Sequence, residues 1–185
     1  MKRGISVLAV IGAGALLVAA LAAGAIGSKP HYVTVDHGQI GGDSWELAIA
    51  GHRGKRCYRQ KLSGSGFDLV GVECRPDRRP PANWNPLGGV GDGDARVSVT
   101  PFVTKKRVHR VSLRIEHPHS HRKHWVRMNT HRMSFAQARE ARVKRNFRFL
   151  NLETRGSECL TKVIMFDGSG SRIRALRLPC YVYKR

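Results

Sequence analysis

One short segment of the chain gathers side chains that bind metals, the histidines His117, His119, His121 and His124. Pro118 disfavours a helix here, and in an extended chain the first three histidines share one face. Imidazoles in this arrangement suit zinc or copper. Because Arg122 and Lys123 lie inside the cluster and repel cations, a solvated basic loop is the competing interpretation. We expect no cofactor, with zinc or copper at this loop as the alternative.

A longer basic stretch surrounds these histidines. Residues 104–148 hold fourteen Lys or Arg against Glu116 and Glu140, and three aromatic residues, including Trp125, are interleaved with them. Cations that neutralise phosphates and aromatics that stack are typical of a polyanion-binding face. The alternative is a generally basic surface with its aromatics in the core. The candidate anion-binding residues are Lys105, Lys106, Arg107, Arg122, Lys123, Arg127, Arg139, Arg142, Lys144 and Arg145.

An acid–base pair for hydrolysis has two candidates in the sequence. Glu116-His117 and His109-Arg110 could serve a secreted, nuclease-like hydrolase, with an Arg on the phosphate. The chain contains no Gly-x-Ser-x-Gly, no His-Glu-x-x-His and no Gly-rich phosphate loop. We therefore assign no catalytic residue and leave enzymatic activity open, with a non-catalytic protein as the expectation.

The N-terminus predicts export. Lys2 and Arg3 precede residues 5–27, which carry no charge, and small residues end this run. Residues 1–27 are therefore expected to be a signal peptide or an uncleaved membrane anchor. Both place residues 28–185 outside the cytoplasm, secreted or anchored. The formal net charge of the chain is +20, a field that attracts polyanions and is screened by salt.

Four cysteines, an even number, lie in the exported part, and this predicts two disulfides. Cys57 and Cys74 flank one Gly-Ser-Gly turn almost symmetrically, and Cys159 and Cys180 flank another. Opposed residues of an antiparallel hairpin lie within disulfide reach, so we expect the pairs Cys57–Cys74 and Cys159–Cys180. An aromatic-x-aromatic or aromatic-x-Leu pattern and Arg-Gly-x-x-Cys precede each turn, which indicates two repeated hairpin units.

The remaining elements are mostly strands separated by turns, which favours a mainly β fold. We expect a small antiparallel β-sandwich or partly open barrel stapled by disulfides. One short helix is predicted at about residues 134–145, capped by Ser134 with Gln137 three residues later. The predicted core residues are Trp45, Leu47, Ile49, Phe147, Phe149, Val163 and Met165.

Three segments follow the predicted N-terminal export segment. Residues 28–80 form a first β unit, residues 81–94 a Pro/Gly-rich loop, and residues 95–185 a second β unit that carries the basic, His-rich segment. The expected function is an exported basic module of the cell envelope or extracellular space. It would bind an envelope polymer, an anionic membrane surface or nucleic acid. A nuclease-like hydrolase and a His-loop metal binder are the alternatives, and the oligomeric state is left open.

Overall fold

The computed structural model describes residues 29–77, 81–82, 84–87, 90–91, 97–117, 120, 122–156 and 158–179. The predicted export segment, residues 1–27, lies outside these ranges, so export stays a prediction. Within the described ranges, no helix is both long enough and apolar enough to cross a membrane.

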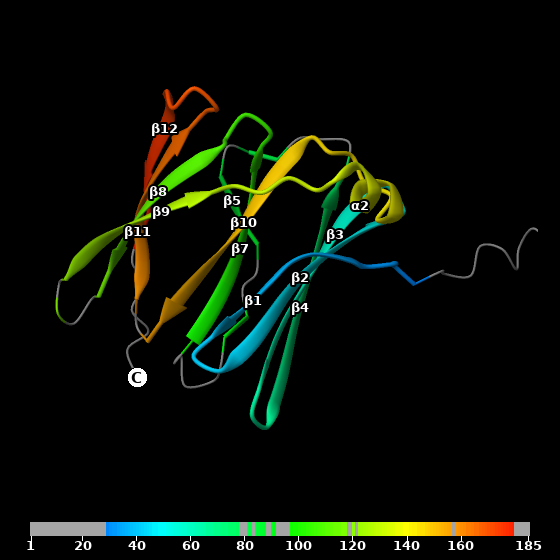
Figure 1. Ribbon diagram of the computed structural model, residues 1–185, viewed down its shortest axis with the longest axis horizontal. Helices are drawn as coiled ribbons and strands as arrows, with labels where there is room; N and C mark the ends of the chain where they lie inside the picture. The colour runs from blue at the N-terminus through cyan, green and yellow to red at the C-terminus, as the bar shows by residue number, and fades with distance from the viewer. Residues whose placement is uncertain are drawn as a thin grey trace, which may run out of the picture.

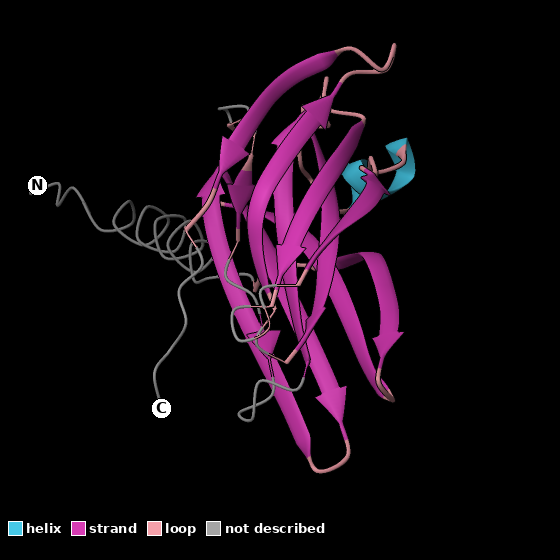
Figure 2. Ribbon diagram, turned by 90° about the vertical axis from the view of Figure 1, so that its left-hand side faces the viewer, coloured by secondary structure: helices cyan, strands magenta, loops and turns pink. Residues whose placement is uncertain are grey.

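Most of the described chain is β-strand, arranged in three antiparallel sheets (Figure 2). Sheet A has the order β1-β2-β3-β4, with the bounds Val33–Ile40, Asp43–His52, Lys55–Gly64 and Phe67–Pro76. Sheet B has the order β10-β7-β5, with β6 also paired to β7; the bounds are Phe147–Arg155, Val97–Lys105, Asn85–Pro86 and Val90–Gly91. Sheet C has the order β12-β11-β8-β9, with the bounds Arg172–Arg177, Cys159–Phe166, Arg110–Glu116 and Lys123–Asn129. The mainly β, antiparallel fold is confirmed.

Sheet B lies between the other two sheets (Figure 1). On β10, Phe147 and Phe149 pack in one core with residues of sheet A, whereas Leu150 and Leu152 pack in another core with residues of sheet C. Successive side chains of a strand point to opposite faces, so a strand covered on both sides is apolar at nearly every position. This explains why β10 carries apolar residues on both of its faces, Phe147 and Phe149 on one and Leu150 and Leu152 on the other. The predicted core residues are all buried.

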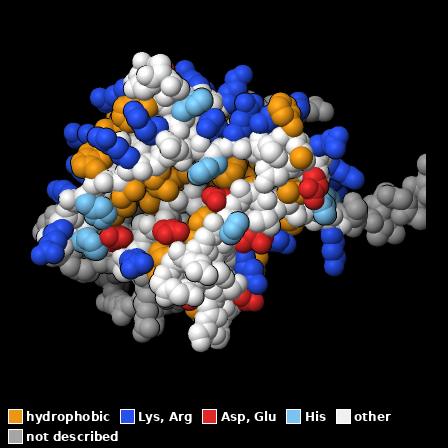
Figure 3. All heavy atoms as spheres, in the orientation of Figure 1, with side chains coloured by type: hydrophobic (Ala, Val, Ile, Leu, Met, Phe, Trp, Pro, Cys, Tyr) orange, Lys and Arg blue, Asp and Glu red, His pale blue; other side chains and the backbone are white. Residues whose placement is uncertain are grey.

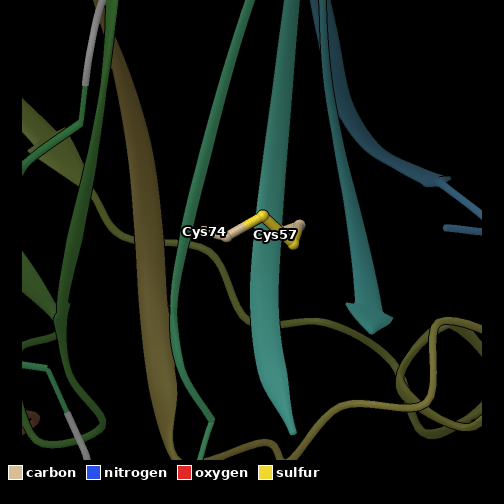
Figure 4. Close-up of a disulfide and its surroundings, with 2 residues drawn as sticks. All are labelled: Cys57 and Cys74. Atoms are coloured by element: carbon tan, nitrogen blue, oxygen red, sulfur yellow. A yellow bond between two sulfur atoms is a disulfide. The ribbon is translucent and has the colours of Figure 1, made fainter. Parts of the chain in front are cut away.

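The first predicted hairpin and its disulfide are confirmed. In β3 and β4, Cys57 lies directly opposite Cys74, and the two are bonded with a Cα–Cα distance of 4.0 Å (Figure 4). Gly64 pairs with Phe67. The intervening turn needs Gly66, whose φ of 85° is in the left-handed region that favours glycine.

The second hairpin is formed by β11 and β12. Its register pairs Lys162 with Arg177 and Val163 with Leu176. Continued along the strands, this register would bring residue 180 opposite Cys159. Cys180 lies outside the described residues, so the pairing of these two cysteines stays a prediction that non-reducing peptide mapping can test.

The two hairpins lie in different sheets. The first belongs to sheet A and the second to sheet C, on either side of sheet B (Figure 1). The strands before them also differ, because β2 pairs with β3 whereas β10 pairs with β7 and not with β11. The Pro/Gly-rich segment contributes β5 and β6 to sheet B, since Trp84, Leu87 and Val90 are buried there.

The predicted helix is present as α2, Phe135–Glu140, at the end of the molecule away from sheet C (Figure 1). Ser134 and Gln137 form the expected capping box. The helix ends before residue 145 because the Ala141 carbonyl accepts a hydrogen bond from the Gly51 backbone at 2.5 Å, and Arg142 adopts a φ of 56°.

Candidate polyanion-binding face

The side of sheet C that faces away from sheet B carries most of the basic side chains of that sheet. On β8 the apolar residues Val111, Leu113 and Ile115 are buried against sheet B, so the alternate residues point outward. We call the resulting surface the sheet C outer face. Its basic and aromatic members are Arg110, Arg114, Lys123, Trp125, Arg127, Lys162, Phe166, Arg172 and Arg177.

Strand register aligns some of these side chains in one row across the sheet. Trp125 is opposite Arg114, Arg114 is opposite Lys162, and Lys162 is opposite Arg177. Neighbouring strands lie about 4.8 Å apart, so three cations and an indole occupy a row of about 14 Å. Like charges placed directly opposite each other destabilise a sheet. A bound polyanion would remove this repulsion.

Aromatic rings lie beside the cations. The Lys162 ammonium is 5.9 Å from the ring centroid of Trp125, and the Arg110 guanidinium is 5.1 Å from that of Phe166. Both distances are within the range of cation–π attraction. Trp125 is 49% exposed although it is a large apolar side chain. Figure 3 shows Lys and Arg side chains among hydrophobic ones over the end of the molecule that holds sheet C.

Acidic side chains do little to neutralise this face. Within the described strands of sheet C, Glu116 is the one acid, and its carboxylate lies 3.7 Å from the Lys123 ammonium. Arg114 is held in place by a 3.0 Å hydrogen bond that its Nε donates to the Thr161 hydroxyl. The face therefore keeps a net positive charge with one of its central cations fixed.

The predicted anion-binding residues divide into two groups. Lys123 and Arg127 lie on the sheet C outer face, Arg122 directly precedes it, and Lys105, Lys106 and Arg107 lie at the turn between β7 and β8. The others lie around α2, at the opposite end of the molecule (Figure 1): Arg139, Arg142, Lys144 and Arg145.

The group around α2 has contacts of its own. The Arg145 guanidinium lies 3.7 Å from the Phe135 ring centroid, and its Nε donates to the Met133 carbonyl at 2.7 Å. Arg145 thus helps to hold the segments on either side of α2 together. Of the candidates in the first group, Lys105 lies close to the start of β10 and so to the α2 group, because strand register places it opposite Phe147.

Sequence reasoning missed several cations of the face. Arg110, Arg114, Lys162, Arg172 and Arg177 were not among the candidates, although they alternate with apolar residues on their strands. On β8 that alternation was the available signal, because it places Arg110 and Arg114 on one side of the strand. On β12, Arg172 and Arg177 are five residues apart, and a register shift in the pairing with β11 brings both beside outward-facing residues of that strand.

The histidine cluster is only partly described. His117 pairs with Glu158 at 3.0 Å, and its ring centroid lies 6.4 Å from that of His124. His119 and His121 lie outside the described residues. Among the residues that are described, no group of three His, Cys, Asp or Glu could hold a metal ion. The metal site stays a prediction.

The two candidate acid–base pairs have different surroundings. Glu116 contacts Lys123 and His117 contacts Glu158, so each of these sequence neighbours has another charged partner. His109 lines a hollow of about 370 Å³.

This hollow also holds Arg110, Arg148 and Asp167. Burial, with a further contribution from the Arg132 guanidinium, lowers the pKa of Arg148. A hydrogen bond from the Ser169 hydroxyl, aided by nearby backbone N–H groups, lowers the pKa of Asp167, which favours its ionised form. The hollow therefore combines cations with an ionised carboxylate.

Known proteins offer no further guide to this site: comparison with protein-family models, with curated proteins and with solved structures finds no match to the chain.

Proposed function

We propose that this chain is an exported, non-catalytic module that binds anionic polymers through the sheet C outer face. The observation that carries the proposal is the row of Arg114, Lys162 and Arg177, in which like charges oppose one another on adjacent strands. Such a row costs folding free energy, and a line of phosphates or carboxylates along it would turn repulsion into attraction.

The class of ligand follows from the same surface. The row is extended rather than pocket-shaped, which suits a polymer more than a small anion. Arg guanidinium forks match phosphate and carboxylate oxygens, and the exposed Trp125 ring offers a stacking or wedging surface. An envelope polymer, an anionic lipid surface and nucleic acid all present this chemistry.

The experiment compares two sets of three substitutions that remove equal charge. The first set, Arg127→Gln, Lys162→Gln and Arg177→Gln, removes cations from the sheet C outer face and leaves the fixed Arg114 in place. The control set is Lys55→Gln, Arg139→Gln and Lys144→Gln, at exposed positions of sheet A and around α2. Binding to duplex DNA, to a teichoic-acid-type phosphate polymer and to anionic vesicles is measured over a range of salt concentrations.

Counterion release gives the expected size of the effect. For duplex DNA, the log–log salt slope should be about −0.9 per phosphate neutralised, so the first set should reduce its magnitude by up to about 2.7. The control set should change it less. Equal losses from both sets would mean that only net charge matters and would overturn the assignment of the site.

A second candidate, a nuclease-like hydrolase, rests on the hollow that His109 shares with Arg110 and Arg148. The same incubations are assayed for polymer cleavage. Cleavage that disappears in a His109→Ala variant would establish this function instead. We expect no turnover.

A further inference from the structure

One edge of the middle sheet is open. Among the described residues, β10 pairs with β7 on one side, and its other side carries a single short bridge between His131 and Phe149. In that bridge the two residues exchange backbone hydrogen bonds of 2.7 and 3.0 Å. After residue 131 the chain turns to α2, and before it β9 diverges into sheet C. The described part of the chain therefore covers the edge at one residue and leaves it open beyond that residue.

The backbone groups that face this edge belong to Asn151 and Glu153. Phe149 faces His131, and backbone direction alternates along a strand, so residues 151 and 153 face the same way. The residue opposite Asn151 on β7 is Pro101, whose carbonyl accepts a hydrogen bond from the Leu87 N–H on the side away from β10. Asn151 and Pro101 therefore do not bond each other, and the backbone groups of Asn151 point outward. No hydrogen bond from these outward backbone groups is found within the described chain.

A cleft of about 360 Å³ lies along this edge. We call it the β10 groove; it lies between residues 151–153, Asp36 and Trp45 of sheet A, and Val126 and Met128 of sheet C. Its volume is within the range of ligand-binding clefts. One wall is thus acidic and aromatic, and the other is apolar. Figure 3 shows carboxylate and His side chains next to a hydrophobic band in the middle of this face.

A buried polar atom in the groove lacks a hydrogen-bond partner, and two carboxylates there lack a cation. Asn151 is 5% exposed, and its Oδ1 has no hydrogen-bond partner, although its amide donates to Asp36 at 2.7 Å. The Glu153 carboxylate accepts from the Trp45 indole at 2.6 Å. Within the described residues, neither the Asp36 nor the Glu153 carboxylate is paired with a cation, although the chain has 33 basic and only 13 acidic residues. A buried acceptor without a donor costs free energy that a ligand can recover.

We propose that the β10 groove binds an extended peptide that adds as a strand to β10. The peptide continues the antiparallel pairing that His131 begins and bonds the outward backbone groups of Asn151 and Glu153. Its side chains alternate: basic ones face Asp36 and Glu153, and apolar ones face the Val126 wall. The partner is therefore an unstructured segment in which basic and apolar residues alternate.

Synthetic peptides test this without changing the protein. The parent probe is an acetylated, amidated octapeptide of alternating lysine and valine. In an antiparallel pair, residues that exchange hydrogen bonds point their side chains to the same face. The lysines would therefore direct their N–H groups toward β10. N-methylation of the lysine amides should weaken binding by at least about tenfold, because each lost bond and each added methyl group opposes pairing. N-methylation of the valine amides should leave binding unchanged.

The two methylated peptides have the same charge and composition, so charge attraction alone cannot separate them. Equal binding of both, or no binding of the parent, would overturn the proposal. A Glu153→Pro variant removes one outward N–H without touching the bonds to β7 and should lower the affinity for the parent. Asp36→Asn should also lower it, whereas Glu140→Gln, which alters an exposed carboxylate on α2, should not. The sheet C outer face is not involved, so failure here leaves the proposed function untouched.

Discussion

Replacing Arg56 with Met tests how the end of sheet A is joined to the start of β10. Arg56 is 2% exposed, and its Nη2 donates to Asp77 at 2.5 Å and to the Asn146 side chain at 2.6 Å. Its guanidinium also lies 4.0 Å from the Phe147 ring centroid. One buried cation therefore connects β3 to the segment that leads into the middle sheet.

The expected loss of unfolding free energy follows from the state of Asp77 after Arg56 is replaced. Met fills much of the volume, but the Asp77 side chain, 14% exposed, keeps its charge with only the Lys144 backbone N–H at 3.3 Å as a described partner. Breaking a buried ion pair by removing one partner costs about 3–5 kcal/mol. Because Asp77 reaches solvent, we expect about 3 kcal/mol. For a protein of this size that lowers Tm by about 6–12 °C.

Urea unfolding of the wild type, of the two single variants Arg56→Met and Asp77→Asn, and of the double variant that combines them measures this loss. The double variant removes the uncompensated charge, so it should recover part of the stability lost in the single variant. A single variant that loses less than about 1 kcal/mol, or a double variant that loses the sum of both single effects, would refute the assignment of Arg56 as a paired buried charge.

Three further predictions concern stability. Replacing Cys57 with Ser removes a disulfide that closes a loop with a sequence separation of 17, and should lower the unfolding free energy by about 3 kcal/mol, as urea titration would show. Gly51→Ala should destabilise the fold, because a Cβ there would collide with the Arg142 backbone carbonyl, and a normal Tm would contradict this contact. The pKa of Asp167 is lowered in the folded state, chiefly by the Ser169 hydroxyl. The stability that ionised Asp167 contributes is therefore present above its pKa in the unfolded chain and is lost as pH falls through its pKa in the folded state. The unfolding free energy should therefore fall less steeply with decreasing pH in Asp167→Asn than in the wild type. Identical pH profiles of the two proteins would contradict the role of this turn.

Local patterns in the sequence were sufficient for several elements. The Cys57–Cys74 pairing follows from symmetry about one turn, because the strands of a tight hairpin have a single register. The capping box at Ser134 is likewise local, and the structure contains it. These features depend on residues close in sequence, so their prediction needed no knowledge of the tertiary fold.

The arrangement of the sheets was not predictable in the same way. The repeat pattern made Phe147 and Phe149 equivalents of Trp45 and Leu47, but β2 lies in sheet A, whereas β10 lies in sheet B, between the other two sheets (Figure 1). Its two apolar faces need two partners, and which sheets supply them depends on long-range packing. The sequence indicated only a basic, His-rich segment at residues 123–129, whereas these residues form β9, in which Val126 and Met128 alternate with polar neighbours.

Sequence proximity was a poor guide to the basic surface. It grouped Arg139 and Arg145 with Lys123, although the structure places α2 and sheet C at opposite ends of the molecule (Figure 1). Strand pairing instead brings Lys162 and Arg177 beside Arg114. Cross-strand neighbours are set by register, which the sequence specifies only once the strand partners are known.

Trp125 can report directly on the proposed binding of anionic polymers to the sheet C outer face. It is one of three tryptophans; the other two, Trp45 and Trp84, are buried, whereas Trp125 is 49% exposed within the row of cations. The measurement is acrylamide quenching of tryptophan fluorescence, with and without a saturating polyanion, in the wild type and in Trp125→Phe. We expect the polyanion to shield the wild type from quenching and to have no such effect on the variant. Binding detected by an independent method, with quenching of the wild type unchanged, would contradict the proposed binding to this face.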